Sequence, residues 1–228
     1  MPPAAVPGPP RRLLPYGRDA LLVDLDDLAG VDTVRHALRT ARDAGGLPGV
    51  VEIVPAARTV LVVVEPGRAD ALAAVRALLA HLDPAAAPGD AGDAPGEEVA
   101  PVELPVHYDG EDLDLVAADA GLAPHEVVAL HVDAAFTVAF GGFAPGFAYL
   151  TGLPEPLHQP RLSTPRTRIP AGAVGVAGGF GGVYPRASPG GWRLLGRLTD
   201  DAPVLFDPHR DPPALLTPGT RVRFRNAG

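Results

Sequence analysis

The sequence contains no cysteine and no lysine, so all 19 of its basic residues are arginines. The lack of cysteine excludes disulfides, thiolate nucleophiles, cysteine-ligated zinc and iron–sulfur clusters, which leaves oxygen and nitrogen groups for any catalysis. The lack of lysine excludes a Schiff-base lysine and the G-x-x-x-x-G-K-[ST] loop that binds nucleotide phosphates. If ATP takes part in the function, this chain does not bind it through a loop of that kind.

Long apolar runs and an excess of positive charge are also missing. No stretch approaches the roughly 18 apolar residues of a membrane span, and residues 1–10 are proline-rich rather than arranged as a signal sequence. A net charge of -8 argues against a phosphate-backbone partner. The histidines show no metal-ligand spacing. We therefore expect a cytoplasmic protein without a metal site, a membrane or a nucleic-acid partner.

The sequence does have 46% hydrophobic residues over 228 positions, enough to build a core for one large or two small domains. Its first 82 residues alternate between strand-like and helix-like patterns. Asp32 or Thr33 can cap the first helix, and Gly45 with Gly46 can end it. The expected elements are strand 19–24, helix 31–44, strands 50–54 and 59–64 and helix 69–82. One more strand would complete a ferredoxin-like α/β sandwich over residues 1–82.

The next segment, residues 83–98, is rich in proline, glycine and aspartate and poor in apolar residues, which predicts a flexible linker. Residues 99–108 alternate like a strand, which begins the second domain and could instead pair with the first. Short helices are expected at 113–120 and 124–131. From residue 136 to 228, short apolar pieces between glycine and proline turns predict a β-barrel or sandwich, so the fold class is α+β.

Residues suited to chemistry gather in three blocks of the second domain. The first block, Gly141–Leu150, combines a Pro145-Gly146 turn with the aromatic residues Phe143 and Phe147. Glycine turns let backbone amides approach a ligand, and the aromatic rings would line an apolar pocket. The alternative interpretation is a tight turn packed on the core.

The second block, Pro160–Pro170, carries Arg161, Arg166 and Arg168 together with Ser163 in a proline-stiffened loop. Such a loop can present guanidinium groups and hydroxyls to a carboxylate or phosphate with little loss of conformational entropy. The alternative is a solvated basic loop that pairs with the protein's own acidic surface. Because three arginines fall within eight residues of an otherwise acidic protein, we favour an anion site.

The third block, Ala171–Trp192, holds eight glycines and places Tyr184 and the pair Gly190-Gly191 close to the chain's only tryptophan, Trp192. Backbone amides in such turns can form an anion-binding nest or an oxyanion hole. Glycine is equally needed wherever a barrel strand kinks, and spacing alone favours that structural role. No spacing singles out a catalytic residue.

Taken together and in this order, the blocks resemble the carboxyltransferase subdomain C and D family, also called allophanate hydrolase subunit 1, which includes the B subunit of 5-oxoprolinase and the KipI kinase inhibitor. The resemblance rests on G-F-A-P-G-F-A-Y-L (142–150), P-R-L-S-T-P-R (160–166), I-P-A-G-A-V-G-V-A-G (169–178), G-V-Y-P (182–185) and S-P-G-G-W-R-L-L-G-R (188–197). It implies an N-terminal α/β domain followed by a cyclophilin-like β-barrel over residues 99–228.

The resemblance also implies a function, namely one component of an ATP-dependent 5-oxoprolinase that opens 5-oxoproline to glutamate. The expected partners are the KipA-type C subunit and the A subunit of that enzyme, and ATP would be bound through the complex. Two alternatives remain. One is a KipI-like inhibitor that binds a sensor histidine kinase, and the other is an amide-binding subunit related to urea and allophanate enzymes.

Carried onto the matching blocks, the resemblance implies a substrate pocket in which Arg166 binds a carboxylate and backbone amides bind a developing oxyanion. The chain departs from the family pattern at Ala173, where serine is usual, and at Phe180 and Gly181, where glutamine and threonine are usual. Polar side chains of the expected pocket are thus missing. The expected substrate-binding residues are Phe143, Pro145, Gly146, Phe147, Arg161, Ser163, Arg166, Tyr184, Gly190, Gly191 and Trp192.

Overall fold

The computed structural model describes residues 12–82 and 100–228, and the chain separates into two compact units, Met1–Glu97 and Glu98–Gly228. The linker predicted for residues 83–98 lies outside the described residues. Each unit has its own hydrophobic core, because the buried side chains form one cluster in the first unit and two in the second.

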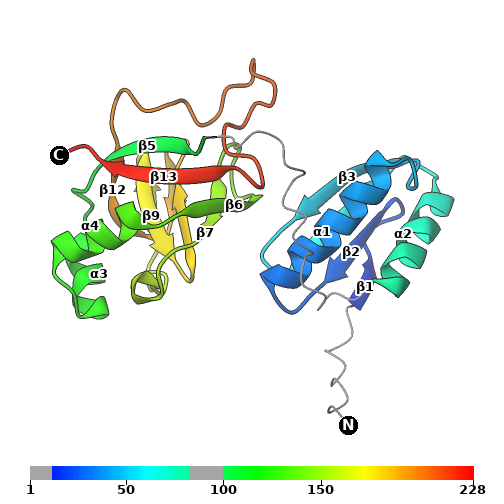
Figure 1. Cartoon of the computed structure of the whole chain (residues 1–228), viewed down its shortest axis with the longest axis horizontal. Coiled ribbons are helices and arrows are strands. Elements are labelled where there is room, and N and C mark those ends of the chain that lie inside the picture. Colours follow the sequence, from blue (N-terminus) through cyan, green and yellow to red (C-terminus); the bar gives the residue numbers. More distant parts are fainter. Residues whose placement is uncertain (1–11, 83–99) are drawn as a thin grey trace, which may run out of the picture. The chain divides into compact units, whose positions relative to one another are not determined.

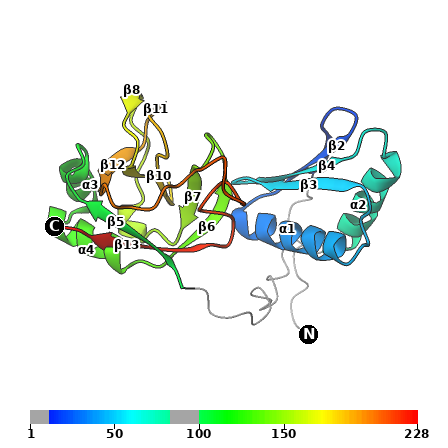
Figure 2. The same cartoon turned by 90° about the horizontal axis from the view of Figure 1, so that it is seen from above.

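The first unit is an antiparallel four-stranded sheet with two helices (Figure 1). Its strand order is β1-β2-β4-β3, and both helices lie on one side of the sheet (Figure 2). The elements are β1 (Arg12–Pro15), β2 (Ala20–Asp24), α1 (Leu28–Asp43), β3 (Val50–Pro55), β4 (Thr59–Val64) and α2 (Ala69–His81).

Helix α1 begins three residues earlier than the sequence pattern predicts. Its N-cap is Asp27, whose carboxylate accepts a hydrogen bond of 2.8 Å from the backbone N–H of Gly30. The prediction of Asp32 or Thr33 as the cap is therefore wrong, since both lie inside the helix. The predicted apolar stripe is present, because Val31, Val34 and Leu38 are fully buried.

The ferredoxin-like arrangement expected for the first unit is not confirmed. The strand expected to complete it, within residues 99–108, is β5 (Val102–His107), which pairs with β12 (Arg193–Leu198) and β13 (Arg221–Asn226) in the second unit. The fourth strand of the first sheet is instead β1, which forms a hairpin with β2. Sequence reasoning missed β1 because it is four residues long and ends in proline.

The second unit is built on a closed barrel of seven strands in the order β10-β7-β6-β13-β5-β12-β9. The pair β5–β13 is parallel and the other described pairs of the barrel are antiparallel. A separate two-stranded sheet, β8–β11, projects from the barrel (Figure 2). The remaining elements are α3 (Leu113–Ala120), α4 (Pro124–Asp133), β6 (Phe136–Gly141), β7 (Ala148–Thr151), the short helix Glu155–Leu157, β8 (Arg166–Ile169), β9 (Ala173–Ala177), β10 (Phe180–Val183) and β11 (Ser188–Gly190).

Helices α3 and α4 start and stop where the sequence predicts, to within two residues. Gly121 adopts a left-handed conformation with φ of 67° and ends α3. Pro124 occupies the first turn of α4, and the Glu126 side chain accepts a hydrogen bond of 2.7 Å from the backbone N–H of Ala123.

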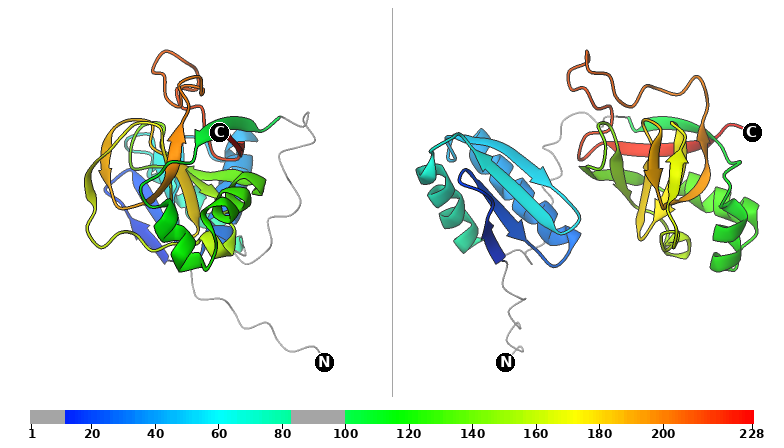
Figure 3. Two further views of the ribbon diagram at one scale, coloured as in Figure 1. Left: turned by 90° about the vertical axis from the view of Figure 1, so that its left-hand side faces the viewer. Right: turned by 180° about the vertical axis from the view of Figure 1, so that it is seen from behind.

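The loop from β12 to β13 stands off from the barrel strands (Figure 3). It is anchored by Leu205 and Leu216, which are buried in the barrel core. The Arg210 guanidinium donates hydrogen bonds of 2.9 to 3.3 Å to four backbone carbonyls of the same loop, those of Val204, Leu205, Pro212 and Pro213. The loop is therefore ordered by its own contacts.

Within the described ranges, no single helix has the length and apolar composition of a membrane span. Only α3 and α4 taken together pass such a test by length and composition, and they are bent by 90° at their break.

Candidate functional site

A cluster of aromatic side chains lies on the barrel where the first and third sequence blocks meet. Phe147 is its centre, with ring centroids 5.2 Å from Tyr149, 5.3 Å from Tyr184 and 5.3 Å from Trp192, all edge to face. Edge-to-face packing of this kind stabilises the fold beyond the free energy that comes from burying apolar area. We refer to the following side chains as the aromatic cluster: Phe140, Phe143, Phe147, Tyr149, Phe180, Tyr184 and Trp192.

The turn between β6 and β7 presents Phe143 to solvent in an unusual backbone conformation. Phe143 has φ of 66°, a left-handed value that is rare for an aromatic residue, and its side chain is 59% exposed. The turn also requires Gly146, which has φ of 81°, and a Cβ there would lie 2.6 Å from the Cβ of Phe206. Phe147, in contrast, is buried in the cluster. The turn thus packs on the core, as the structural interpretation of this block expects, and also exposes one ring, while its role in binding a ligand stays a prediction.

Tyr184 is a buried ring next to a tight backbone approach. Its side chain is 2% exposed, and a Cβ at Gly190 would lie 2.5 Å from its hydroxyl oxygen. Burial raises the pKa of Tyr184 to about 12, while the backbone of Trp192 and the positive charges of Arg161 and Arg166 act in the opposite direction. Two arginines of the second block therefore lie within electrostatic reach of the aromatic cluster.

The proline-stiffened loop of the second block is fixed beside the third block. The backbone N–H of Leu162 donates a hydrogen bond of 2.8 Å to the carbonyl of Gly191, and a Cβ on Gly191 would lie 3.8 Å from the Cβ of Arg161. Arg161 and Ser163 are exposed. Nowhere in residues 12–82 or 100–228 does Arg161 have a hydrogen-bond or ion-pair partner.

Arg166 is held by contacts within the chain. It donates hydrogen bonds from Nη2 to Oδ1 of Asp112 at 2.8 Å, from Nε to Oε2 of Glu111 at 3.2 Å and from Nη1 to the carbonyl of Trp192 at 3.5 Å. Asp112 is 5% exposed, and its Oδ2 accepts a hydrogen bond of 2.7 Å from the backbone N–H of Leu194. The hydrogen bond to Asp112 is the main cause that raises the pKa of Arg166.

A second arginine attaches α3 to the barrel. Arg193, 8% exposed, donates from Nη1 to Oδ2 of Asp119 and to Oε1 of Gln159, both at 2.5 Å. Its Nε is buried without a partner among the described residues. The start and the end of α3 are thus both held to β12, through the hydrogen bond from Leu194 to Asp112 and the contact of Arg193 with Asp119.

Two of the three departures from the family pattern lie in or beside the aromatic cluster, and the third faces the main barrel core. Ala173 is buried beside Phe147 and Tyr184 in the same apolar core, and Phe180 contributes a ring to the cluster. Gly181 is buried on β10, where a Cβ would lie 3.3 Å from Cε1 of Phe136. These positions make this part of the barrel apolar, where the family pattern would place hydroxyl and amide groups.

The structure thus brings residues of all three blocks near Tyr184, namely Phe143, Phe147, Arg161, Arg166 and Gly190, and the role of the predicted residues in substrate binding stays a prediction. Phe147, Tyr184, Gly191 and Trp192 are buried, whereas the other members are exposed or half-buried. Sequence reasoning missed Glu111, Asp112 and Phe206, which contact the site. No local signal could have found them, because Asp112 lies 54 positions from Arg166 in the chain.

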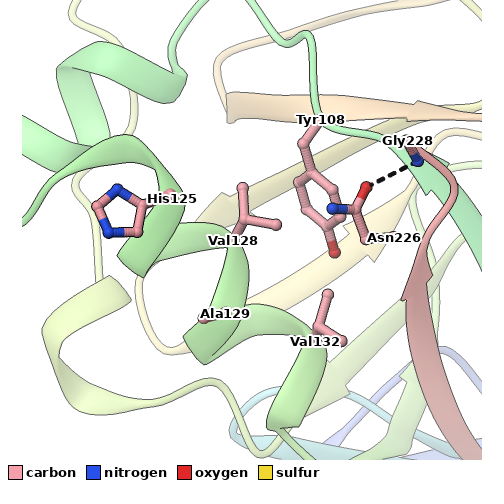
Figure 4. A pocket seen from close by; sticks show the side chains of 7 residues that line it. All are labelled: Tyr108, His125, Val128, Ala129, Val132, Asn226 and Gly228. Carbon is pink, nitrogen blue, oxygen red and sulfur yellow. Dashed lines mark hydrogen bonds between the residues drawn. The ribbon is translucent and has the colours of Figure 1, made fainter.

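A hollow of about 390 Å³ lies elsewhere on the barrel unit, between α4 and the end of β13. Figure 4 shows Tyr108, Val128, Val132 and Asn226 around this space. None of its lining residues belongs to the aromatic cluster. Beneath it, the hydroxyl of Tyr108 lies 2.8 Å from Nδ1 of the fully buried His131, and burial lowers the pKa of His131 to about 3.

Comparison with known proteins identifies relatives over nearly the whole chain. Residues 11–216 match the family described as carboxyltransferase domain, subdomain C and D. The B subunit of 5-oxoprolinase from Escherichia coli O157:H7 is 39% identical over 211 residues, which are 91% of this chain and 92% of that protein. The B subunit of 5-oxoprolinase from Haemophilus influenzae is 35% identical over 215 residues, 93% of this chain and 96% of that protein.

Solved structures include relatives of different length. A crystal structure of TTHA0988 is 37% identical with a TM-score of 0.72, and it matches 92% of this chain, which spans only 40% of that longer one. The protein PH0987 from Pyrococcus horikoshii is 31% identical with a TM-score of 0.53, covering 94% of this chain and 97% of that one. The urea amidolyase of K. lactis matches all of this chain and 15% of its own, with a TM-score of 0.68 and 19% identity, which shows the fold alone.

Proposed function

This chain belongs to the carboxyltransferase domain, subdomain C and D, family, and on that premise we propose that it is one component of an ATP-dependent 5-oxoprolinase. The observation that carries the proposal is the pair of relatives named as B subunits of 5-oxoprolinase, which match more than nine tenths of this chain and of their own lengths. In the proposed reaction, water adds across the ring amide of 5-oxoproline and glutamate is formed, while ATP is hydrolysed.

The proposal requires other chains. The relatives are named as subunits, which implies a complex of several chains. We infer that the partners are a KipA-type C subunit and an A subunit. ATP would be bound through this complex, since the absence of lysine removes the usual phosphate-binding loop from this chain.

The site around Tyr184 suits such a substrate chemically. 5-Oxoproline is a planar ring amide with a carboxylate, and flat rings pack well on aromatic side chains. Guanidinium groups bind carboxylates in a bidentate manner. The exposed Phe143, the fixed loop at Arg161 and the glycine backbone at Gly190 and Gly191 offer both kinds of contact. An oxyanion formed during ring opening would need backbone N–H donors of this kind.

Two finer statements about the fold belong to the same proposal. We infer that the first unit is a variant of the ferredoxin-like sandwich, and the support is its order β1-β2-β4-β3 with both helices on one side. We infer that the second unit is cyclophilin-like in shape, which the family resemblance implies for the closed barrel. Neither name carries an activity.

Reconstitution tests the proposal. The purified chain is combined with the A and C subunits, and the formation of ADP and glutamate is measured with and without 5-oxoproline. We expect ATP hydrolysis that depends on 5-oxoproline and requires all three chains. Proline, which lacks the ring carbonyl, is the matched substrate control and should not stimulate. If the chain adds nothing to the activity of its partners alone, the proposal is wrong.

A further inference from the structure

The two arginines of the second block differ in whether they are available to a ligand. In Arg166, each of the three guanidinium nitrogens already has an acceptor, and two of these acceptors are carboxylates. A substrate carboxylate at Arg166 would have to displace Glu111 or Asp112. If the Asp112 carboxylate stayed in place, it would be a buried charge without its cation, and if it moved away, the Leu194 N–H would lose its acceptor.

Arg161 is in the opposite situation. Its guanidinium is exposed and, among the residues that the structure describes, contacts no acceptor. Its backbone is nevertheless held in place, because the neighbouring Leu162 is hydrogen bonded to Gly191. A backbone that is already held in place reduces the conformational entropy lost when the side chain binds a ligand.

The position of Arg161 points to the aromatic cluster. Its charge acts on Tyr184, whose ring lies 6.1 Å from the ring of Phe143 and nearly perpendicular to it, at 85°. The backbone of Arg161 also lies beside the cluster, because a Cβ on Gly191, the residue before Trp192, would lie 3.8 Å from the Cβ of Arg161. The exposed ring of Phe143 and the side chain of Arg161 thus both lie close to the buried ring of Tyr184.

We propose that Arg161, and not Arg166, binds the carboxylate of the substrate, and that Arg166 is a structural residue that joins β8 to α3 and β12. The ligand class is a small planar ring amide with one carboxylate, whose ring packs near Phe143 and whose carboxylate pairs with Arg161. This inference rests on the proposed function and deepens it, because it assigns the anion contact of that same site to one residue. It reverses the role that the family resemblance implied for Arg166.

The test compares Arg161→Gln with Arg223→Gln in the assembled three-chain complex. Arg223 is exposed on β13, so its substitution removes the same charge at a position outside the aromatic cluster. For Arg161→Gln we expect the KM for 5-oxoproline to rise about 10- to 100-fold with little change in kcat, as for a lost charged hydrogen bond. Arg161→Lys should recover part of the loss, because it restores the charge without the planar fork.

Pyrrolidin-2-one, the same ring without the carboxylate, separates a carboxylate contact from a general disturbance of the site. As an inhibitor of the complex it should bind the wild-type and Arg161→Gln proteins equally well. A KM for 5-oxoproline in Arg161→Gln that equals that of Arg223→Gln overturns the inference. An equal loss of pyrrolidin-2-one and 5-oxoproline binding overturns it too.

If the complex shows no activity with 5-oxoproline, the proposed function is wrong. The inference about Arg161 can then still be tested by measuring binding directly. The single tryptophan, Trp192, lies in the aromatic cluster and is 4% exposed, so its fluorescence reports on the site. The full chain is titrated with 5-oxoproline. A saturable change in wild type and in Arg223→Gln that is absent in Arg161→Gln supports the inference, and no change in wild type overturns it.

Discussion

Nη2 of Arg166 donates a hydrogen bond of 2.8 Å to Oδ1 of Asp112, a residue 54 positions earlier in the chain. Asp112 precedes α3, while Arg166 begins β8, so this single contact joins two segments that share no strand pairing. The second oxygen of Asp112 accepts the backbone N–H of Leu194 at 2.7 Å. The carboxylate is buried and yet compensated on both oxygens, which is the condition under which a buried charge is tolerated.

Removing that carboxylate should destabilise the barrel unit. We expect Asp112→Ala to lower the free energy of unfolding by about 2–4 kcal/mol, less than for a fully buried pair because Arg166 is partly exposed. Urea unfolding followed by Trp192 fluorescence measures it. Asp109→Ala, which breaks the exposed Arg197–Asp109 pair of 3.0 Å, is the matched control and should cost less than about 1 kcal/mol. Equal losses in the two variants would contradict the assignment of Arg166 as structural.

Two neighbouring glycines allow a sharp test of the packing against Tyr184. A Cβ at Gly190 would lie 2.5 Å from the Tyr184 hydroxyl and 2.9 Å from Cδ1 of Ile169, so Gly190→Ala must displace the ring. We expect a loss of about 1–3 kcal/mol and a changed Trp192 emission spectrum. A Cβ at Gly191 would lie 3.5 Å from its nearest neighbour, the carbonyl oxygen of Leu162, so Gly191→Ala should leave the stability and the emission spectrum unchanged. The prediction fails if Gly190→Ala has the wild-type spectrum and stability.

A substitution of Phe143 should affect the stability of the chain and the function of the complex in different ways. Asparagine tolerates a φ of 66° better than phenylalanine does, so Phe143→Asn should leave the stability of the isolated chain unchanged or raise it by up to about 1 kcal/mol. The same change removes an exposed ring beside Tyr184 and should raise the KM for 5-oxoproline of the complex. Val204→Asn, at another exposed apolar residue, is the control for lost surface hydrophobicity. A strong loss of stability in Phe143→Asn alone would show that the ring is a core residue.

His131 should make the stability of the barrel unit depend on pH. Because burial lowers its pKa from 6.5 to about 3, the folded state disfavours the proton that the unfolded state binds below pH 6.5. The contribution of neutral His131 is therefore complete above pH 6.5 and is lost as the pH falls from there towards 3. Near pH 5.5 the loss should be about 1.4 kcal/mol.

The measurement is urea unfolding at pH 7.5 and 5.5, followed by Trp192 fluorescence so that only the barrel unit is observed. His131→Leu should show a smaller difference between the two pH values than wild type does. His81→Gln, which changes an exposed histidine of the first unit, is the control and should keep the wild-type difference. If His131→Leu keeps it as well, another group is responsible.

The sequence predicted those elements whose signals are local. Helix α3 ends at Gly121 and α4 begins at Pro124 because glycine and proline act on their own backbone. The position of β5 depended on partners more than 80 residues away in the chain, so its alternation identified a strand and left its sheet undetermined. The chain is α+β in class as expected, because short strands between turns can be recognised without knowledge of their order in a sheet.

For the candidate site, too, sequence reasoning found the features with local signals and missed those that depend on the fold. The aromatic residues and glycines of the three blocks were found from composition, and they do meet around Tyr184. The roles of the arginines could not be found in this way. Arg161 and Arg166 look equivalent within one stiff loop, and only the folded chain shows that Arg166 has carboxylate partners and that Arg161 has none among the described residues.

The parallel pairing of β13 with β5 has a consequence for synthesis on the ribosome. Strand β13 lies between β5 and β6, although some 80 to 115 residues of chain separate it from either one. A nascent chain that has produced every earlier barrel strand still has a gap in the wall. Closure waits until residue 226 has left the exit tunnel, and until then the facing edges of β5 and β6 are open to pairing with other chains.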